Sequence, residues 1–254
     1  MNERTNREKT FHDARYLDGV GARPQDYFYS ALGDAKKLLE SEIFQCIETG
    51  GIGVEIGCSN GENLERLLKQ HHFVAYGIDI SSTAIEAAQR RFQTQAFVPK
   101  LEVMDANNLT YPDKKFDFCF GSGVIHHLQL PQALSEINRV LRPGGKMVFL
   151  EPLATNPFIQ FYRFLTPGDR SADETPLTPT HIKDLEVIFG CVRLEFFGFC
   201  TLAGVMLKRW PSVQATFMRL AGRIDESFFK LPGAWRFAWV VVIRAERTDI
   251  LETD

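Results

Sequence analysis

The sequence predicts an α/β fold with a doubly wound, mostly parallel sheet. Short β-rich runs alternate with amphipathic helical stretches over residues 52–152, and a glycine-containing turn, Gly57 to Gly61, follows the first run. Strands that alternate with helices join through right-handed crossovers into a parallel sheet, and such sheets bind ligands at the carboxyl ends of their strands. We therefore expect a binding crevice at that edge of the sheet.

The expected elements succeed one another in a regular order. A helix over 33–49 is followed by strands at 52–56, 73–80, 97–104, 116–120 and 146–150, which alternate with helices at 60–71, 81–93 and 131–141. Ser81 or Ser82 is a suitable N-cap for the helix over 81–93, and Thr180 for a helix in TPTHIKDLEVIFG. Two final β-rich runs, CVRLEFFGF and FAWVVVIRAER, bring the number of strands to seven.

Composition excludes several classes of protein. With 254 residues, 44% of them hydrophobic, the chain is long enough for one large α/β domain or two small ones. A net charge of −3 gives no general attraction to nucleic acid. The five cysteines are scattered without the spacing of metal ligands, which indicates reduced thiols and no metal site. The polar N-terminus contains no secretory signal, so we expect a cytoplasmic protein.

The turn VEIGCSNGEN, residues 54–63, is suited to a nucleotide-like ligand. Gly57 and Gly61 allow a sharp turn and a close approach of a ligand to main-chain amides. The dinucleotide pattern G-x-G-x-x-G is absent, and a carboxylate, Glu55, precedes the turn. Glu55 would repel a pyrophosphate but attract a ligand that carries an ammonium and a sulfonium. Plain turn glycines and a surface Glu55 are the alternative.

Two further carboxylates end the next two strands. Asp79, in YGIDIS, follows the glycine turn by about twenty residues, where a carboxylate can accept both hydroxyls of a ribose; capping the next helix is the alternative. Asp105, in LEVMDANNL, ends the third strand near the expected place of an adenine amino group. Ala106 or Asn107 could serve there in its place.

Together these motifs resemble those of a class I S-adenosylmethionine-dependent methyltransferase with a methyltransferase type 11 core. Five blocks within residues 50–152 carry the resemblance: VEIGCSNGEN, YGIDIS, VMDANNL, FDFCFGSGVIHHL and RVLRPGGKMVFLEP. The resemblance implies a Rossmann-like seven-stranded sheet with an antiparallel last strand, helical insertions, and S-adenosylmethionine as cofactor. The cofactor-binding residues that it implies are Glu55, Gly57, Cys58, Ser59, Gly61, Asp79, Ile80, Asp105, Ala106 and Gly121. Ser59 stands where many relatives have glycine.

Methyl transfer requires a protein to align the acceptor, to exclude water and, for some acceptors, to remove a proton. The candidate bases are His126 and His127 in GVIHHL and Glu151 in LEP, past the fourth and fifth strands. Hydrogen bonds to the local backbone are the alternative role of the two histidines, and Glu151 could instead anchor the loop.

Segments outside the common core are expected to select the substrate. The predicted division is an N-terminal arm or lid, residues 1–32, and a methyltransferase domain, residues 33–254, with insertions at about 153–180 and 200–235. A disordered tail is the alternative for the arm. The insertion at 200–235 is expected to form a helical pair that acts as a substrate lid, a dimer face or a lipid contact, in that order; it is too charged to cross a membrane.

The predicted function is methyl transfer from S-adenosylmethionine to a small, largely apolar or aromatic acceptor, on oxygen, nitrogen or carbon, of natural-product type. The insertion at 200–235 and the arm are expected to wall the acceptor site. Two alternatives stay open: an enzyme acting on a lipid-linked or glycan precursor at the membrane surface, and a non-catalytic cofactor-binding scaffold. A homodimer and a peripheral membrane contact are open as well, and the core hosts too many substrates to name the acceptor.

Overall fold

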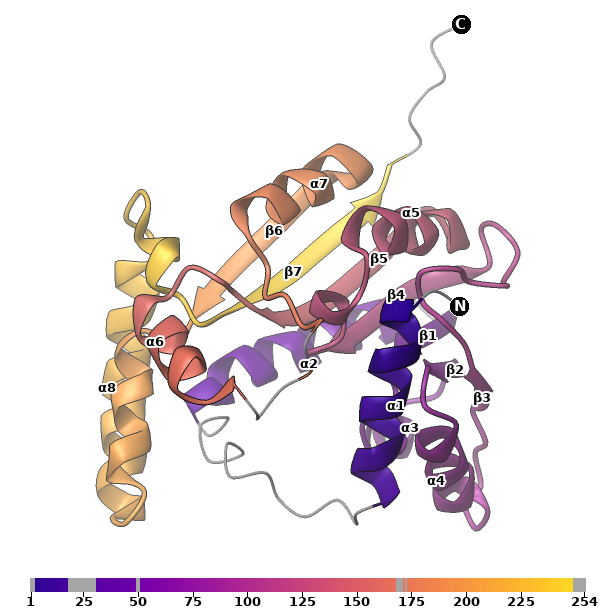
Figure 1. Cartoon of the computed structure of the whole chain (residues 1–254), viewed down its shortest axis with the longest axis horizontal. Coiled ribbons are helices and arrows are strands. Elements are labelled where there is room, and N and C mark those ends of the chain that lie inside the picture. Colours follow the sequence, from indigo (N-terminus) through magenta and orange to yellow (C-terminus); the bar gives the residue numbers. More distant parts are fainter. Residues whose placement is uncertain (1–2, 18–30, 49–50, 168–170, 172, 249–254) are drawn as a thin grey trace, which may run out of the picture.

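The computed structural model describes residues 3–17, 31–48, 51–167, 171 and 173–248. Its centre is a seven-stranded sheet with strand order β3-β2-β1-β4-β5-β7-β6 (Figure 1). The strands are β1 (Ile52–Ile56), β2 (Val74–Asp79), β3 (Lys100–Val103), β4 (Phe116–Ser122), β5 (Leu141–Pro152), β6 (Gly190–Phe197) and β7 (Val240–Arg247). Neighbours pair in parallel except β7, which runs antiparallel to both β5 and β6. The predicted doubly wound sheet with an antiparallel last strand is confirmed.

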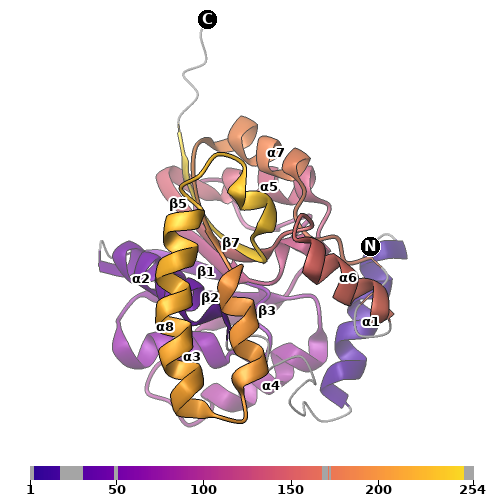
Figure 2. The same cartoon turned by 90° about the vertical axis from the view of Figure 1, so that its left-hand side faces the viewer.

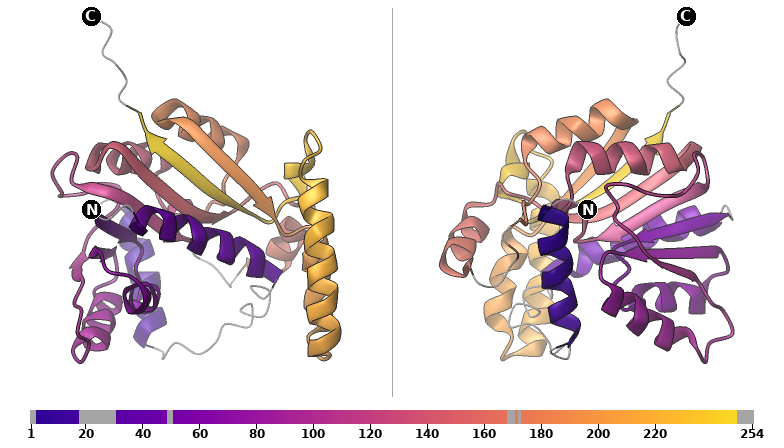
Figure 3. Two further views of the ribbon diagram at one scale, coloured as in Figure 1. Left: turned by 180° about the vertical axis from the view of Figure 1, so that it is seen from behind. Right: turned by 45° about the vertical axis from the view of Figure 1, so that its right-hand side comes forward.

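Helices cover both faces of this sheet (Figure 3). The helices α2 (Gly33–Glu48), α3 (Glu62–Gln70) and α4 (Ser82–Phe92) pack on one face, and α5 (Leu130–Val140) and α7 (Pro179–Phe189) on the other. Side chains of β4 alternate between the two cores: Cys119 packs with α5 and α7, whereas Phe118 and Phe120 pack with α2 and α3. With both faces closed, the carboxyl ends of the strands remain as the route to a ligand site.

The strands β3 and β5 are among those that differ from their predicted bounds. The strand β3 begins at Lys100 rather than at 97, because Pro99 has no amide hydrogen to donate to a ladder. The strand β5 begins at Leu141, which pairs with Phe116 before the register shifts, and therefore includes RPGG as well as the predicted 146–150.

The N-caps of two helices test the predicted cap residues. Ser81 caps α4, since its hydroxyl accepts a hydrogen bond from the amide of Ala84 at 3.1 Å. The predicted cap Thr180 is wrong: Thr178 caps α7, and Pro179 follows it in the first turn. Proline suits that position because the first helical amide has no partner within the helix.

The segments outside the core fold largely as helices. The predicted arm is helical over α1 (Glu3–Leu17), so the disordered-tail alternative is wrong there, and residues 18–30 lie outside the described part of the chain. The predicted helix in 153–180 is α6 (Pro157–Leu165). Between β6 and β7 lie the 3-10 helix η4 (Cys200–Leu207), the helix α8 (Pro211–Phe228) and the short η5 (Ala234–Phe237). Among the described residues, no helix is both long and apolar enough to span a bilayer.

Candidate cofactor and methyl-transfer site

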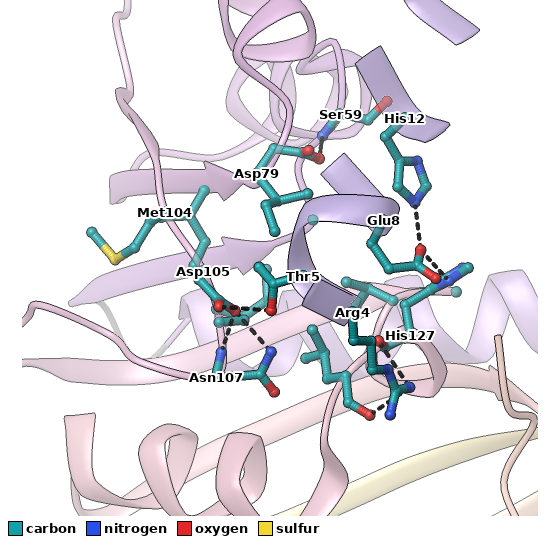
Figure 4. Close-up of a pocket in the computed structure, with 18 of the residues that line it drawn as sticks. Arg4, Thr5, Glu8, His12, Ser59, Asp79, Met104, Asp105, Asn107 and His127 are labelled. Carbon is teal, nitrogen blue, oxygen red and sulfur yellow. Dashed lines mark hydrogen bonds and ion pairs between the residues drawn. The ribbon is translucent and has the colours of Figure 1, made fainter. Parts of the chain in front are cut away.

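A pocket of about 240 Å³ lies at the carboxyl ends of the early strands, between the sheet edge and α1 (Figure 4). It is where the sequence predicts the crevice. Six of the predicted cofactor-binding residues line it: Gly57, Ser59, Asp79, Ile80, Asp105 and Ala106. Their role in binding stays a prediction, but the fold has brought side chains from three separate strand ends to one cavity.

Asp79 holds the glycine turn in place. One carboxylate oxygen accepts a hydrogen bond from the amide of Ser59 and the other from the amide of Ser81, both at 2.9 Å. Ser59 has a positive φ of 54°, and Gly57 one of 70°. A Cβ on Gly57 would lie 2.6 Å from Val124, so only glycine fits there without a shift of that side chain. Burial raises the pKa of Asp79, although the two amides oppose this effect.

The segment after β3 forms a second polar wall. Asp105 accepts hydrogen bonds from the amide and the side-chain nitrogen of Asn107, at 2.9 and 2.8 Å. The Thr5 hydroxyl of α1 donates to its other carboxylate oxygen at 3.4 Å. Asp105, Ala106 and Asn107 all line the pocket, so the three residues between which the sequence did not decide lie together.

Four predicted cofactor residues do not line this pocket, and their role in binding stays a prediction. Gly121, in β4, packs so tightly that a Cβ would approach the carbonyl of Ile56 to 2.7 Å. Gly61 begins α3 with a φ of 75°, and a Cβ there would meet Phe92 of α4. Cys58 is buried, and burial raises the pKa of its thiol well above the ordinary value. These three residues serve turn geometry and packing.

The fourth is Glu55, which the structure buries between β1 and α3. It is 5% exposed, and Oε1 accepts a hydrogen bond from the Asn63 side chain at 2.7 Å. Val54 and Ile56 belong to the opposite core, so alternation along the strand turns Glu55 toward α3 and away from the pocket. In this structure Glu55 therefore contacts α3, and its attraction to a cationic ligand stays a prediction.

We expect Glu55→Gln to stabilise the protein more at pH 8 than at pH 5. Burial raises the pKa of Glu55 from 4.5 to about 8, against the hydrogen bond from Asn63. The stability that the neutral carboxyl contributes is thus complete below pH 4.5 and is lost as the pH rises toward 8, whereas glutamine loses nothing. Since one pKa unit is about 1.4 kcal/mol, the gain should grow by a few kcal/mol. Urea unfolding at several pH values measures it.

The exposed Glu62, the first residue of α3, gives the matched control. Glu62→Gln should change the unfolding free energy by less than about 0.5 kcal/mol at every pH. A gain from Glu55→Gln that does not vary with pH would contradict the raised pKa.

Glu151 and His126 form a buried pair outside the pocket. Glu151 is completely buried, and its Oε1 accepts hydrogen bonds from the amides of Val124 and Ile125 at 2.9 and 3.1 Å. Its Oε2 lies 2.6 Å from Nδ1 of His126, which is 6% exposed. This geometry favours the alternative in which the carboxylate anchors the loop after β4, and it gives neither residue access to an acceptor.

His127 lines the pocket and is the predicted base that the structure places at the site (Figure 4). Its Nδ1 lies 3.1 Å from Oε2 of Glu8, a charge contact rather than a well-aligned hydrogen bond. The same oxygen lies 3.5 Å from Nε2 of His12, and Ser171 donates to Oε1 at 2.5 Å. Burial acts to raise the pKa of Glu8, but His12, His127 and Ser171 outweigh it and hold the pKa well below its ordinary value. Glu8 is therefore a carboxylate at neutral pH.

The helix α1 closes the pocket with side chains that the sequence did not single out as binding residues. Arg4, Thr5, Glu8 and His12 line the pocket, and they share one face of the helix at spacings of three or four residues. Arg4 donates to the carbonyls of residues 127, 128 and 173 at 3.0 to 3.3 Å. The helical spacing of Glu8 and His12 was the only signal in the sequence, and it does not identify their partners.

The second half of α1 is fastened to α4. The Asp13 carboxylate accepts hydrogen bonds from the hydroxyls of Ser81 at 2.6 Å and Thr83 at 3.0 Å. Arg7 forms a two-point contact with Asp173, with both nitrogen to oxygen distances at 2.8 Å. These contacts fix α1 across the pocket from both ends.

The insertion at 200–235 borders a different cavity. None of its described residues lines the pocket under α1. Residues of α8 instead line a cavity of about 650 Å³ together with α2 and β6, including Arg219, Arg223, Leu38 and Phe197. The predicted wall of the acceptor site is thus supported for the N-terminal arm only.

The strand order, the glycine turn after β1 and the carboxylates after β2 and β3 define a class I methyltransferase fold. Residues 54–149 match the family model described as a methyltransferase domain. This match agrees with the class I S-adenosylmethionine-dependent methyltransferase core that the motifs predict.

Curated relatives share this core. The chain is 37% identical over 91 residues to a demethylmenaquinone methyltransferase of Symbiobacterium thermophilum, a match that covers 35% of this chain and 36% of that protein. It is 30% identical over 135 residues to a 2-phytyl-1,4-naphtoquinone methyltransferase of Nostoc punctiforme, which covers 48% and 59%. The chain thus spans roughly a third to three fifths of the length of these relatives.

A solved structure resembles the chain over nearly its whole length. Geranyl diphosphate C-methyltransferase of Streptomyces coelicolor A3(2), in complex with Mg²⁺, geranyl diphosphate and S-adenosyl-L-homocysteine, has a TM-score of 0.65 at 11% identity. The match covers 98% of this chain and 99% of that one. At this identity the likeness concerns the fold, including its N-terminal and C-terminal additions.

Proposed function

We propose that this protein transfers a methyl group from S-adenosylmethionine to a small, largely apolar or aromatic acceptor. The observation that carries the proposal is the position of Asp79 at the pocket, fixed beside the turn of Gly57 and Ser59. The Asp79 carboxylate accepts one backbone hydrogen bond on each oxygen, and each oxygen has a second lone pair. It can therefore still accept hydrogen bonds from both hydroxyls of a ribose. The alternative role as a mere helix cap is disfavoured, because the Ser81 hydroxyl already caps α4.

The remaining polar wall suits the rest of the cofactor. Asp105, Ala106 and Asn107 would border the adenine, and the turn at Gly57 would let the methionyl part approach main-chain amides. A bound sulfonium supplies an already activated methyl group. The chain's own residues then have to align the acceptor, exclude water and hold a proton.

His127 is the base in this proposal. It is the one of the three predicted bases that lines the pocket, and the Glu8 carboxylate next to its Nδ1 can stabilise the imidazolium that forms when Nε2 takes a proton. His126 and Glu151 satisfy each other in the interior. Glu8 is accordingly a positioning residue, supplied by α1.

The acceptor class rests on the apolar share of the site and on the relatives. Ile56, Ile78, Met104, Val124 and Leu128 contribute apolar side chains to the pocket. Curated relatives carry names of methyltransferases for demethylmenaquinone and phytyl-naphthoquinone, which are apolar, ring-containing acceptors. We therefore propose a reduced quinone or a similar ring compound with an apolar tail.

Calorimetry and a transfer assay test this function. The native protein should bind S-adenosylmethionine and S-adenosylhomocysteine. When a naphthohydroquinone with a prenyl tail is added together with S-adenosylmethionine, the protein should form the methylated acceptor and S-adenosylhomocysteine. Water-soluble amines and sugars form the control panel, and they should give no product above background. Absence of cofactor binding would contradict the proposal, whereas binding without transfer to any ring compound would favour the scaffold alternative.

A further inference from the structure

We propose that the face formed by α6, η4 and α8 binds the surface of an anionic phospholipid bilayer. We name it the apolar face, and define it by the exposed residues of 157–165 and 206–237. Figure 2 shows α8 and η4 side by side on the side of the molecule that is turned to the viewer, and α6 on the same side but nearer to α1. The inference goes beyond methyl transfer, because binding to lipid requires neither cofactor nor acceptor.

Exposed apolar side chains concentrate on this face. Of fifteen large apolar side chains that are exposed among the described residues, eleven lie in 157–165 and 206–237. They are Phe158, Phe161, Phe164, Leu165, Met206, Trp210, Val213, Leu220, Ile224, Leu231 and Phe237. The other four are scattered valines. Isolated exposed apolar residues are ordinary, but a set on one side of the molecule that includes every exposed large aromatic among the described residues indicates an interaction surface.

The helix α6 exposes its apolar side chains, whereas an ordinary surface helix buries them. Its Phe158, Phe161 and Phe164 are 66%, 65% and 79% exposed and recur every three residues, and none of its nine residues is buried. Its cation points inward, since Arg163 pairs with Glu174, which is part-buried, at 2.5 Å. An apolar outer face on a helix that is capped and paired in this way is a stable feature of the fold.

The helix α8 adds an apolar stripe. Val213, Leu220 and Ile224 are each 56% exposed, and their spacings of seven and four residues place them on one side of the helix. The opposite side is anchored, because buried Asp225 accepts hydrogen bonds from the amides of residues 199–201 and from the Thr201 hydroxyl. The helix α8 therefore cannot rotate to bury the stripe without breaking the hydrogen bonds to Asp225.

Charge selects the partner. Six exposed cations lie in residues 200–237, namely Lys208, Arg209, Arg219, Arg223, Lys230 and Arg236, whereas Glu226 is the one exposed acid in this range. Arg219, Arg223 and Lys230 also line the cavity shared with α2 and β6, where the acids Asp34 and Glu195 lie. Lys208, Arg209 and Arg236 lie outside that cavity, and the face keeps a net positive charge in a chain whose net charge is −3. Aromatic and aliphatic residues flanked by cations are typical of segments that lie in the interface of an anionic membrane.

A second copy of the chain fits this face less well. A two-fold symmetric dimer would bring the face against itself, with six cations on each side and one exposed acid on each side to compensate them. An anionic headgroup layer covers the same apolar area and neutralises the cations. The absence of a bilayer-spanning helix among the described residues agrees with a segment that lies on the surface.

Flotation with lipid vesicles and Trp210 fluorescence test the proposal. The full chain should float with vesicles of phosphatidylcholine and phosphatidylglycerol, and weakly with phosphatidylcholine alone, and added salt should reduce binding. Trp210 is 59% exposed, so its emission should shift to shorter wavelength on binding, and Trp210→Phe should remove most of the shift while flotation persists.

Phe161→Ser combined with Leu220→Ser should lower partitioning by about tenfold or more. Val187→Ser on α7 is the matched control, because Val187 is 79% exposed and lies outside the apolar face. Two results would overturn the proposal: equal partitioning of the double variant and the control, or no flotation of the native chain together with a dimer that the double variant dissociates in light scattering. Calorimetry with S-adenosylmethionine on the same samples tests the proposed function separately, since these variants leave the pocket unchanged.

Discussion

Asp79→Ala is expected to weaken S-adenosylmethionine binding by about 1–3 kcal/mol, roughly five- to 150-fold in Kd. Without the carboxylate, the ribose hydroxyls would lose their proposed acceptor, and the Ser59 amide would lose its hydrogen-bond partner as well. Isothermal calorimetry on the folded variant measures the change. Unchanged affinity would overturn the ribose assignment of Asp79.

A second substitution separates the two contributions. Asp79→Asn keeps one oxygen as an acceptor for the turn but removes the charge, so it should lie between the native protein and the alanine variant. Asp113→Ala is the matched control, since the Asp113 side chain is 69% exposed and lies outside the pocket. A variant of Asp79 that loses binding because it has unfolded will be recognised by its melting temperature.

Local patterns were sufficient for most of the fold. The strand β1 has the predicted bounds, because a run of apolar residues between glycine-containing turns leaves few other solutions. The N-cap of α7 was predicted two residues late, although Pro179 carried the signal: proline prefers the first turn, which makes Thr178 the cap. Thr178 and Thr180 both suit an N-cap, and the position of Pro179 distinguishes between them.

The site could be predicted only in part, because proximity along the chain does not decide which face a side chain takes. Glu55 is the last residue but one of β1, and Asp79 is the last residue of β2, so both lie next to the glycine turn. Glu55 nevertheless faces α3, whereas Asp79 faces the pocket. For Gly121, the neighbouring residues Ser122 and Gly123 line the pocket instead. A shift of one residue in an extended strand exchanges the two faces.

The contribution of α1 could not be predicted from local sequence. Its hydrogen bonds to other elements join residues 68 to 169 positions apart, such as Arg4 with the carbonyl of His127. No periodicity encodes such a pairing, since it depends on where α1 docks after the sheet has formed. Under the proposed function, α1 both borders the pocket and supplies Glu8, the residue that contacts the proposed base His127.

The proposed base gives the largest expected effect on rate. His127→Gln should lower kcat by roughly a hundredfold to ten-thousandfold for an acceptor that must lose a proton, because glutamine cannot take that proton. S-adenosylmethionine affinity should change little, because the proposed ribose and adenine contacts come from Asp79 and from residues 105–107 rather than from His127. His72→Gln, at an exposed histidine, is the matched control and should keep the native rate.

Glu8→Gln separates support of the base from its chemistry. With the carboxylate neutralised, His127 remains in the pocket but loses its charged partner, so kcat should fall by less than in His127→Gln. If Glu8 has a purely structural role, Glu8→Gln should lower the melting temperature and leave kcat of the folded protein unchanged. If His127→Gln itself turns over at a near-native rate, the base assignment is wrong, and transfer proceeds by alignment of the acceptor alone.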